Sequence, residues 1–219
     1  MRHIRALLLG LAWLLALGPA CAQGAEPRTR EQALAALRDT ASVEQRQQGA
    51  LWLGRTGLMG DVPALIQSLR DPDAVVRALA EQSLWQVWSR SGDPDVDALF
   101  QHGLEQMQAN EAEAAIETFS EIIRRKPDFA EGWNKRATLY YLVGEFEKSL
   151  ADCDEVMQRN PVHFGALSGY GLIYLRLRQP ERALPYFERA LAVNPNLDQI
   201  QAAVEALREA LGRKPDNTT

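Results

Sequence analysis

Apolar and small residues return at a fixed interval of 34 positions through the second half of the chain. Pro127, Pro161 and Pro195 mark this period, and the columns between them keep their chemical character from copy to copy. The columns are small or apolar: Gly103, Ala137 and Gly171; Ala115, Ser149 and Ala183; Phe119, Cys153 and Phe187; Ile122, Val156 and Ala190. A period of this length predicts stacked helix–turn–helix units, which form a binding surface rather than a reaction centre.

Each unit also has the signals that end its helices. Asn110, Gly144 and Arg178 share the column where the two helices of a unit must turn, and Asn and Gly tolerate the left-handed conformation found there. Pro180 suits the start of the next helix. The three spaced prolines end the second helices, because proline lacks the amide proton and its ring clashes with the preceding turn.

At these positions the chain resembles the tetratricopeptide repeat family, whose pattern is Trp-x2-Leu-Gly-x2-Tyr, then Ala-x3-Phe, then Pro. The first unit matches this pattern least well. At three positions where Leu is commonest the chain has Arg136, His102 and Tyr170, and Cys153 stands where an aromatic residue is commonest. The residues in the pattern positions are Leu99, His102, Gly103, Gln106, Ala115, Phe119 and Pro127; Trp133, Arg136, Ala137, Tyr140, Ser149, Cys153 and Pro161; and Leu167, Tyr170, Gly171, Tyr174, Ala183, Phe187 and Pro195. The resemblance implies an all-α protein, a right-handed α-solenoid with units at 96–129, 130–163 and 164–197.

The region before these units shows a second kind of repetition. The triplet at 37–39, Leu-Arg-Asp, returns at 69–71, and the stretch 61–77 resembles a HEAT-type unit with a turn at 71–73. Pro72 suits the start of the helix after that turn. We therefore expect a HEAT-like pair over 23–92. Two units are fewer than the three usually needed for stability, so the pair should lean on the later array, in a continuous solenoid with at most a slight bend at 91–95.

The two ends of the chain differ from the repeats. Ile200, Val204, Leu207 and Leu211 form one apolar face, which predicts a capping helix at 198–213 followed by a disordered tail at 214–219. At the other end, a basic start and an apolar run at 6–17 precede the small residues at 20–22. This pattern is typical of a secretory signal peptide removed after residue 22, and it predicts a periplasmic protein.

A rival interpretation makes Cys21 a lipid-anchored N-terminus. A lipoprotein signal normally has Leu or a similar residue three places before the cysteine, and Gly18 stands there instead. Membrane contact is expected only if Cys21 is lipidated.

The charge balance excludes some partners. The chain has a net charge of −5, and the first 22 residues include two arginines and no acid, so their removal leaves 22 basic and 29 acidic side chains. A diffuse acidic balance argues against nucleic acid and anionic lipid surfaces. The one basic run, at 124–126, falls in the last turn of a predicted helix, where positive charge complements the helix dipole.

No catalytic arrangement is found in the sequence. His102 and His163 are far apart, the first on a packing face and the second in a loop between units, so no metal site and no cofactor are expected. Cys153 falls in a packing column and is interpreted as a small buried residue. Asp152 and Asp154 point in different directions on one helix, and we expect both to be solvated.

In tetratricopeptide arrays the first helices of successive units line a concave groove that holds a peptide or an amphipathic helix of another protein. The resemblance places eleven residues on this face: Phe100, Leu104, Met107, Asn134, Thr138, Tyr141, Leu142, Ser168, Leu172, Leu175 and Arg176. We expect the strongest contacts from Asn134, Tyr141, Leu172, Leu175 and Arg176. The Lys/Asn/Arg cluster that clamps a C-terminal carboxylate in co-chaperone members is absent from this face. An alternative for the first unit is that Phe100 and Leu104 pack against the HEAT-like pair.

The sequence therefore predicts a non-enzymatic interaction scaffold or adaptor of the bacterial periplasm. The alternative function is a lipid-anchored structural or assembly subunit of an envelope complex. Some HEAT-type proteins resemble bilin lyases, but the chain offers no convincing nucleophile or base for an enzyme. The oligomeric state does not follow from the sequence.

Overall fold

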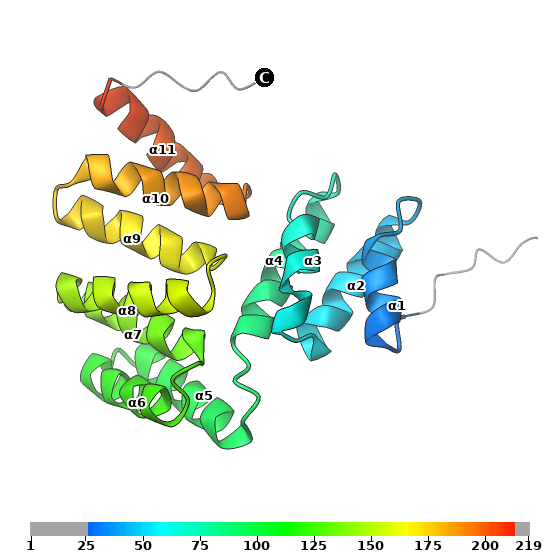
Figure 1. The fold of residues 1–219 in the computed structure, drawn as a ribbon, viewed down its shortest axis with the longest axis horizontal. Helices are drawn as coiled ribbons and strands as arrows, with labels where there is room; N and C mark the ends of the chain where they lie inside the picture. Colours follow the sequence, from blue (N-terminus) through cyan, green and yellow to red (C-terminus); the bar gives the residue numbers. More distant parts are fainter. Residues whose placement is uncertain (1–25, 213–219) are drawn as a thin grey trace, which may run out of the picture.

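The computed structural model describes residues 26–212, and this part of the chain consists of helices without any strand (Figure 1). The expected signal peptide, Cys21 and the C-terminal tail lie outside the described residues. The helices are α1 (Arg30–Leu37), α2 (Val43–Thr56), the 3-10 helix η1 (Met59–Asp61), α3 (Val62–Ser68), α4 (Ala74–Trp88), α5 (Pro94–Gln108), α6 (Ala112–Arg125), α7 (Ala130–Leu142), α8 (Phe146–Arg159), α9 (Phe164–Arg176), α10 (Pro180–Val193) and α11 (Asp198–Ala210).

Helices α5 to α10 form three stacked pairs with α11 at their end, so the expected all-α solenoid is confirmed (Figure 1). The turn column behaves as predicted: Asn110, Gly144 and Arg178 all have positive φ, at 61°, 82° and 57°. The second helix of each pair ends two residues before the spaced proline. Local chemistry therefore defines where the first and the second helix of each unit end.

The small column lets the two helices of a unit approach closely. A Cβ added at Gly103 would lie 2.7 Å from Cζ of Phe119, and one added at Gly171 would overlap the ring of Phe187. Both phenylalanines are fully buried. Each large ring thus occupies the space that the missing side chain leaves on the facing helix.

The N-terminal region forms two helix pairs, α1–α2 and α3–α4. Arg46 on α2 donates to both carboxylate oxygens of Asp71, at 2.6 and 3.0 Å, and also to the carbonyl of Asp39. Asp73 caps α4 by accepting from the amide of Val76. Helix α4 begins at residue 74, so Pro72 lies before the helix rather than at its start as expected.

These pairs do not extend the solenoid on the N-terminal side of α5. The prediction of a continuous solenoid with at most a slight bend is therefore wrong. Figure 1 shows α1 to α4 beside the stack, with α4 next to the repeat helices. Trp85 and Trp88 of α4 contact Phe164, with ring centroids 5.2 and 5.1 Å apart. Phe164 belongs to α9, yet it is buried in the N-terminal core with Leu84 and Val87. The two N-terminal helix pairs pack against the repeat array, as expected, but they contact its side.

Polar contacts extend this interface to the loop between α10 and α11. Arg70 donates to the carbonyl of Val193 at 3.1 Å, and Nδ2 of Asn196 donates to the carbonyl of Leu69 at 2.8 Å. Nδ2 of Asn194 donates to Glu81 at 3.0 Å. The first two contacts satisfy backbone carbonyls at the ends of helices, which have no partners within the helix, and the third joins two side chains.

Two glycines on α9 make a matched test of this packing. We expect Gly171→Ala to destabilise the chain by about 1–3 kcal/mol, because its Cβ overlaps the buried Phe187 ring. Gly169→Ala is the control: its Cβ would lie at an ordinary 3.7 Å from Sγ of Cys153, and we expect it to stabilise the helix by up to about 1 kcal/mol. Urea unfolding followed by circular dichroism measures both, and equal effects would contradict the packing role of Gly171.

Candidate partner-binding site

A pocket of about 150 Å³ opens between α7 and α9, the first helices of the second and third units. Its floor includes two residues of α8, Ser149 and Cys153. The full lining is Asn134, Ala137, Thr138, Tyr141, Ser149, Cys153, Gly165, Ala166, Ser168, Gly169, Leu172 and Ile173. Because most of these side chains are small, two helices that pack in register still leave a hollow between them.

The serine and threonine hydroxyl groups of the lining donate to backbone carbonyls of the protein. Oγ of Ser149 donates to Ala137 at 2.7 Å, Oγ of Ser168 to Phe164 at 2.8 Å, and Oγ1 of Thr138 to Asn134 at 2.9 Å. The side-chain amide of Asn134 donates to both oxygens of Glu131, at 3.1 Å. A hydrogen-bond acceptor that enters the pocket therefore cannot bind these protons, because each already has an acceptor within the protein.

The thiol of Cys153 is buried and free of any disulfide, so the prediction of a small buried residue is confirmed. Burial raises its pKa to about 12, and the neighbouring carboxylates of Asp152 and Asp154 add to this rise. The thiol thus stays protonated at neutral pH, which gives the pocket floor no charge and no nucleophile.

The mouth of the pocket is more polar and more exposed. Tyr141 lines the pocket, and Nε of Arg176 donates to its hydroxyl at 3.1 Å. The guanidinium also lies 5.7 Å from the centre of the Tyr141 ring. Leu172 in the lining is 41% exposed, and Leu142 at the end of α7 is 66% exposed. Apolar surface and positive charge therefore meet at this rim.

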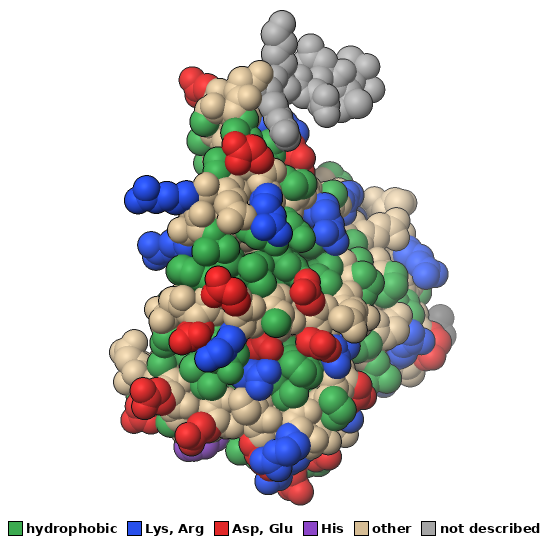
Figure 2. Space-filling view, turned by 60° about the vertical axis from the view of Figure 1, so that its left-hand side comes forward, with side chains coloured by type: hydrophobic (Ala, Val, Ile, Leu, Met, Phe, Trp, Pro, Cys, Tyr) green, Lys and Arg blue, Asp and Glu red, His purple; other side chains and the backbone are tan. Residues whose placement is uncertain are grey.

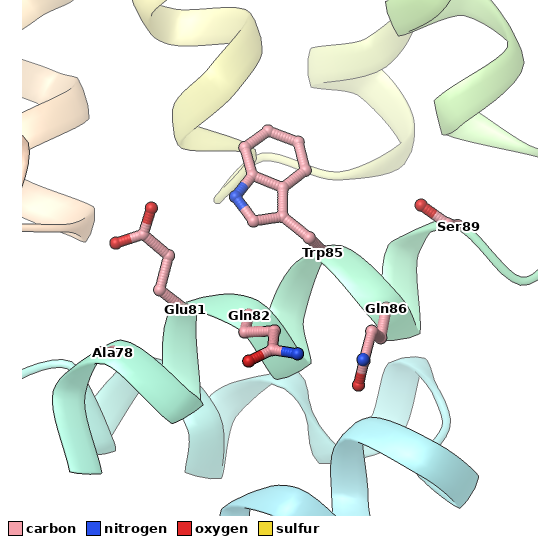
Figure 3. A pocket seen from close by; sticks show the side chains of 6 residues that line it. All are labelled: Ala78, Glu81, Gln82, Trp85, Gln86 and Ser89. Carbon is pink, nitrogen blue, oxygen red and sulfur yellow. The ribbon is translucent and has the colours of Figure 1, made fainter. Parts of the chain in front are cut away.

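The opposite end of the pocket touches the N-terminal pair. A Cβ at Gly165 would lie 2.5 Å from the Trp85 ring, so the indole occupies the space beside this lining residue. Figure 3 shows Trp85 and Glu81 pointing from α4 toward the repeat helices, whereas Gln86 points away from them. Helix α4 thus forms the boundary of the pocket at the start of α9.

A buried polar cluster lies beneath this contact. Glu131 is fully buried and accepts from Nζ of Lys135 and Nε2 of His163, both at 2.9 Å, as well as from Asn134. Nδ1 of His163 accepts the amide proton of Ala166 and so caps α9. Since Nδ1 is an acceptor, the proton of the imidazole is on Nε2, and the ring is neutral.

The same imidazole joins the cluster to α4. Trp88 stacks on the His163 ring with centroids 4.5 Å apart, and Trp85 contacts it edge-on at 5.5 Å. Nζ of Lys135 lies 5.6 Å from the centre of the Trp85 ring. Asn134 in the pocket is thereby connected through Glu131 and His163 to the tryptophans of the N-terminal pair.

The cluster keeps its carboxylate ionised. Burial alone would raise the pKa of Glu131, but the charge of Lys135 and the hydrogen bond from His163 outweigh it and lower this pKa to about 2. A carboxylate deprived of water is thus stabilised by one cation and two further donors.

Five of the eleven residues predicted for the groove line the pocket: Asn134, Thr138, Tyr141, Ser168 and Leu172. Leu142 and Arg176 are exposed, with Arg176 beside Tyr141 of the lining, and Leu175 packs against the core of the last units. These last three do not line the hollow itself.

The three residues from the first unit do not belong to this pocket. Phe100 is fully buried and contacts Phe119 and Phe129 at 5.7 and 5.4 Å, so the prediction that it faces a partner is wrong. Leu104 and Met107 pack against the same core. The alternative contact with the N-terminal pair is also wrong for Phe100, because this core lies within the first unit and the start of the second.

Two predictions about single residues are also wrong. His102 does not pack: its side chain is 58% exposed and lies 3.8 Å from Glu105. Asp152 is not solvated but buried, and it pairs with Nε and Nη2 of Arg136, both at 2.8 Å. Arg136 also donates to Ser120, so the residue that stands in place of Leu ties α7 to α6 and α8.

The sequence interpretation missed Glu131, Lys135, Trp85 and the capping role of His163, because their partners come from separate helices. A signal for the pocket was present in the small residues at the start of α9, Gly165, Ala166, Ser168 and Gly169. Within residues 26–212, no group of three or more His, Cys, Asp or Glu side chains is placed to hold a metal ion. None of the helices between residues 26 and 212 has the length and apolar character that a bilayer-spanning segment requires.

The lowered pKa of Glu131 makes acid destabilisation testable. A carboxylate with a lower pKa in the folded chain than in the unfolded chain contributes stability that is lost as the pH falls. We expect Glu131→Gln to cost about 1–3 kcal/mol at pH 7, and we expect this cost to shrink between about pH 5 and pH 2, as the wild-type carboxylate takes up a proton. Urea unfolding at several pH values measures the difference, and a pH-independent difference would contradict the assignment.

The chain matches known tetratricopeptide proteins in sequence. The family profile described as Tetratricopeptide repeat matches residues 100–161 and, separately, residues 164–197. A TPR repeat-containing protein of Rhizobium etli is 35% identical over 142 residues, which cover 65% of this chain and 69% of that protein. The Hsp70-Hsp90 organizing protein of Triticum aestivum is 24% identical over 153 residues, which cover 68% of this chain but 25% of that protein.

Solved structures share the fold at lower identity. The first TPR domain of RPAP3, bound to an HSP90 peptide, superposes with a TM-score of 0.51 at 21% identity, over 53% of this chain and 93% of that one. MamA superposes with a TM-score of 0.51 at 18% identity, over 70% of this chain and 80% of that one. Both likenesses show the fold alone. The repeat profiles and the Rhizobium etli relative together show that the chain belongs to the tetratricopeptide repeat family.

Proposed function

We propose that this protein is a non-enzymatic interaction scaffold that holds a segment of a partner protein, a peptide or an amphipathic helix, against α7 and α9. The observation on which the proposal rests is the pocket between these helices, with Leu172 and Thr138 exposed beside it. A hollow with exposed apolar residues is typical of a surface that receives a side chain of another molecule.

Relatives and structural neighbours support a peptide as the partner. Two solved tetratricopeptide domains that share the fold have peptides of HSP90 and Hsp70 bound to them. The helices of the present groove are held by packing on both sides, so they are ordered before a partner arrives. The partner segment alone then loses conformational freedom, which favours binding.

The chemistry of the pocket also favours a scaffold over an enzyme. The histidine nearest to it, His163, is fully buried beneath two tryptophans, and Cys153 is a protonated thiol. Neither is available as a nucleophile or a general base to a molecule in the pocket.

We further propose that the scaffold works in the bacterial periplasm. The support is the basic start, the apolar run at 6–17 and the small residues at 20–22. The N-terminal helix pairs at 30–37, 43–56, 62–68 and 74–88 fit the proposed HEAT-like organisation. A lipid anchor at Cys21 would place the same scaffold on a membrane.

Site-specific photocrosslinking tests the groove. A benzophenone amino acid at Thr138, exposed beside the pocket, should capture a partner in intact cells. The same group at Ala151, exposed on α8 outside the pocket lining, should not. The Tyr141→Ala/Leu175→Ala double variant, shown to be folded by circular dichroism, should lose the crosslink from Thr138. Capture from Ala151 alone would place the working surface elsewhere.

Intact mass measurement tests export. Expressed with its own N-terminus in a Gram-negative bacterium, the chain should be recovered from the periplasm with a mass that corresponds to a start at Gln23. A chain that begins at a diacylated Cys21 would support the anchored alternative, and a full-length chain in the cytoplasm would contradict export.

A further inference from the structure

We propose that the pocket between α7 and α9 receives one bulky apolar side chain of the partner, a Leu, Met, Ile or Phe, and that an acidic residue close to it in the partner pairs with Arg176. This inference rests on the proposed function, because it specifies which segment the groove selects. It is carried by the size of the pocket, by its lining and by the charge at its rim.

The volume fits a single side chain. The pocket measures about 150 Å³. An apolar cavity of about this volume holds a benzene-sized molecule, so one branched aliphatic or aromatic side chain fills it. A whole helix or strand does not fit, and the rest of the partner must lie outside, over Leu172 and Thr138.

The inner part of the lining offers no hydrogen-bond donor to a carboxylate or a carbonyl group. The three hydroxyl protons at Thr138, Ser149 and Ser168 go to backbone carbonyls, and the Asn134 amide goes to Glu131. The hydroxyl of Tyr141 lies beside Arg176 at the rim. Deeper in the pocket, an acceptor group would lose its hydration without gaining a donor, which is unfavourable. An apolar side chain has no such cost, and it gains the contacts of the surrounding methyl and methylene groups.

Two positions of α9 beside the hollow lack a side chain. Gly165 and Gly169 both line it, and their roles differ. Trp85 of α4 already occupies the space above Gly165, whereas the nearest side-chain atom to a Cβ at Gly169 is Sγ of Cys153, at 3.7 Å. The space next to Gly169 is therefore open to a side chain of another molecule.

The rim supplies the charge. Arg176 donates to Tyr141 but has no carboxylate at ion-pair distance within residues 26–212, and the same holds for the exposed Arg178 and Arg182. Figure 2 shows lysine and arginine side chains gathered at the level of α9 and α10, above a region with more acidic side chains. An acidic residue of the partner would complete the pairing at this edge and would fix the orientation of the segment.

A random library of 12-residue peptides displayed on phage and selected against the full chain tests the inference. We expect enrichment of one bulky apolar residue with Asp or Glu within four positions of it. A fluorescent copy of an enriched peptide should bind the Gly169→Leu variant about tenfold to a hundredfold more weakly, because the new side chain occupies the pocket. Ala151→Leu, which adds the same side chain on exposed α8, is the matched control and should bind like the wild type.

Two exposed positions provide variants that do not depend on tolerance of a buried substitution. Leu172→Ala removes part of the pocket wall and should weaken binding. Arg176→Glu should weaken the acidic peptide and strengthen a copy with Lys in place of its acid, each by about twofold to fivefold. If Gly169→Leu fails to fold, these two variants decide the question.

The outcomes separate this inference from the proposed function. Peptides that lack an apolar anchor, or that bind the folded Gly169→Leu variant as well as the wild type, overturn the anchor pocket. The groove function still stands in that case if Thr138 crosslinks to the partner. If no peptide is selected and Thr138 captures nothing, the proposed function itself is wrong.

Discussion

The contact of Trp85 and Trp88 with His163 and Phe164 decides how the two halves of this protein are arranged. Two short helix pairs bury too little apolar surface to be stable alone, and the N-terminal core becomes closed only when Phe164 of the third repeat unit enters it. Because Phe164 is the first residue of α9, the pairs must lie across the side of the array. The boundary of the pocket at Gly165 follows from that position.

The repeat array uses small residues in two different ways. Gly171 allows Phe187 to approach α9, so the space of the missing side chain is filled from within the unit. Gly169, two residues earlier on the same helix, borders a hollow that nothing in the described chain fills. One glycine therefore serves the stability of the fold, and the other borders the hollow that we propose as the site for a partner side chain. Their different surroundings follow from the helical rotation between them.

Buried polar groups connect the pocket to the interface with α4. Glu131 is held by Lys135, His163 and Asn134, and this leaves the pocket lining without a free amide donor at Asn134. The same His163 caps α9 and stacks under Trp88. The proposed partner site and the junction of the two halves thus share one hydrogen-bonded cluster, in which the loss of any member removes a partner from a buried polar group.

The sequence alone determined the repeat: the helix pairs, their left-handed turns at Asn110, Gly144 and Arg178, and the small columns all depend on neighbours within about 34 residues. The resemblance to the family also indicated five of the twelve residues that line the pocket, among them Asn134, Thr138 and Leu172. Only the tertiary structure decided the course of α1 to α4, the burial of Phe100 and Asp152, and the cluster at Glu131. Those features depend on which residues from distant segments exclude water together, and a local pattern of apolar and polar positions does not contain that information.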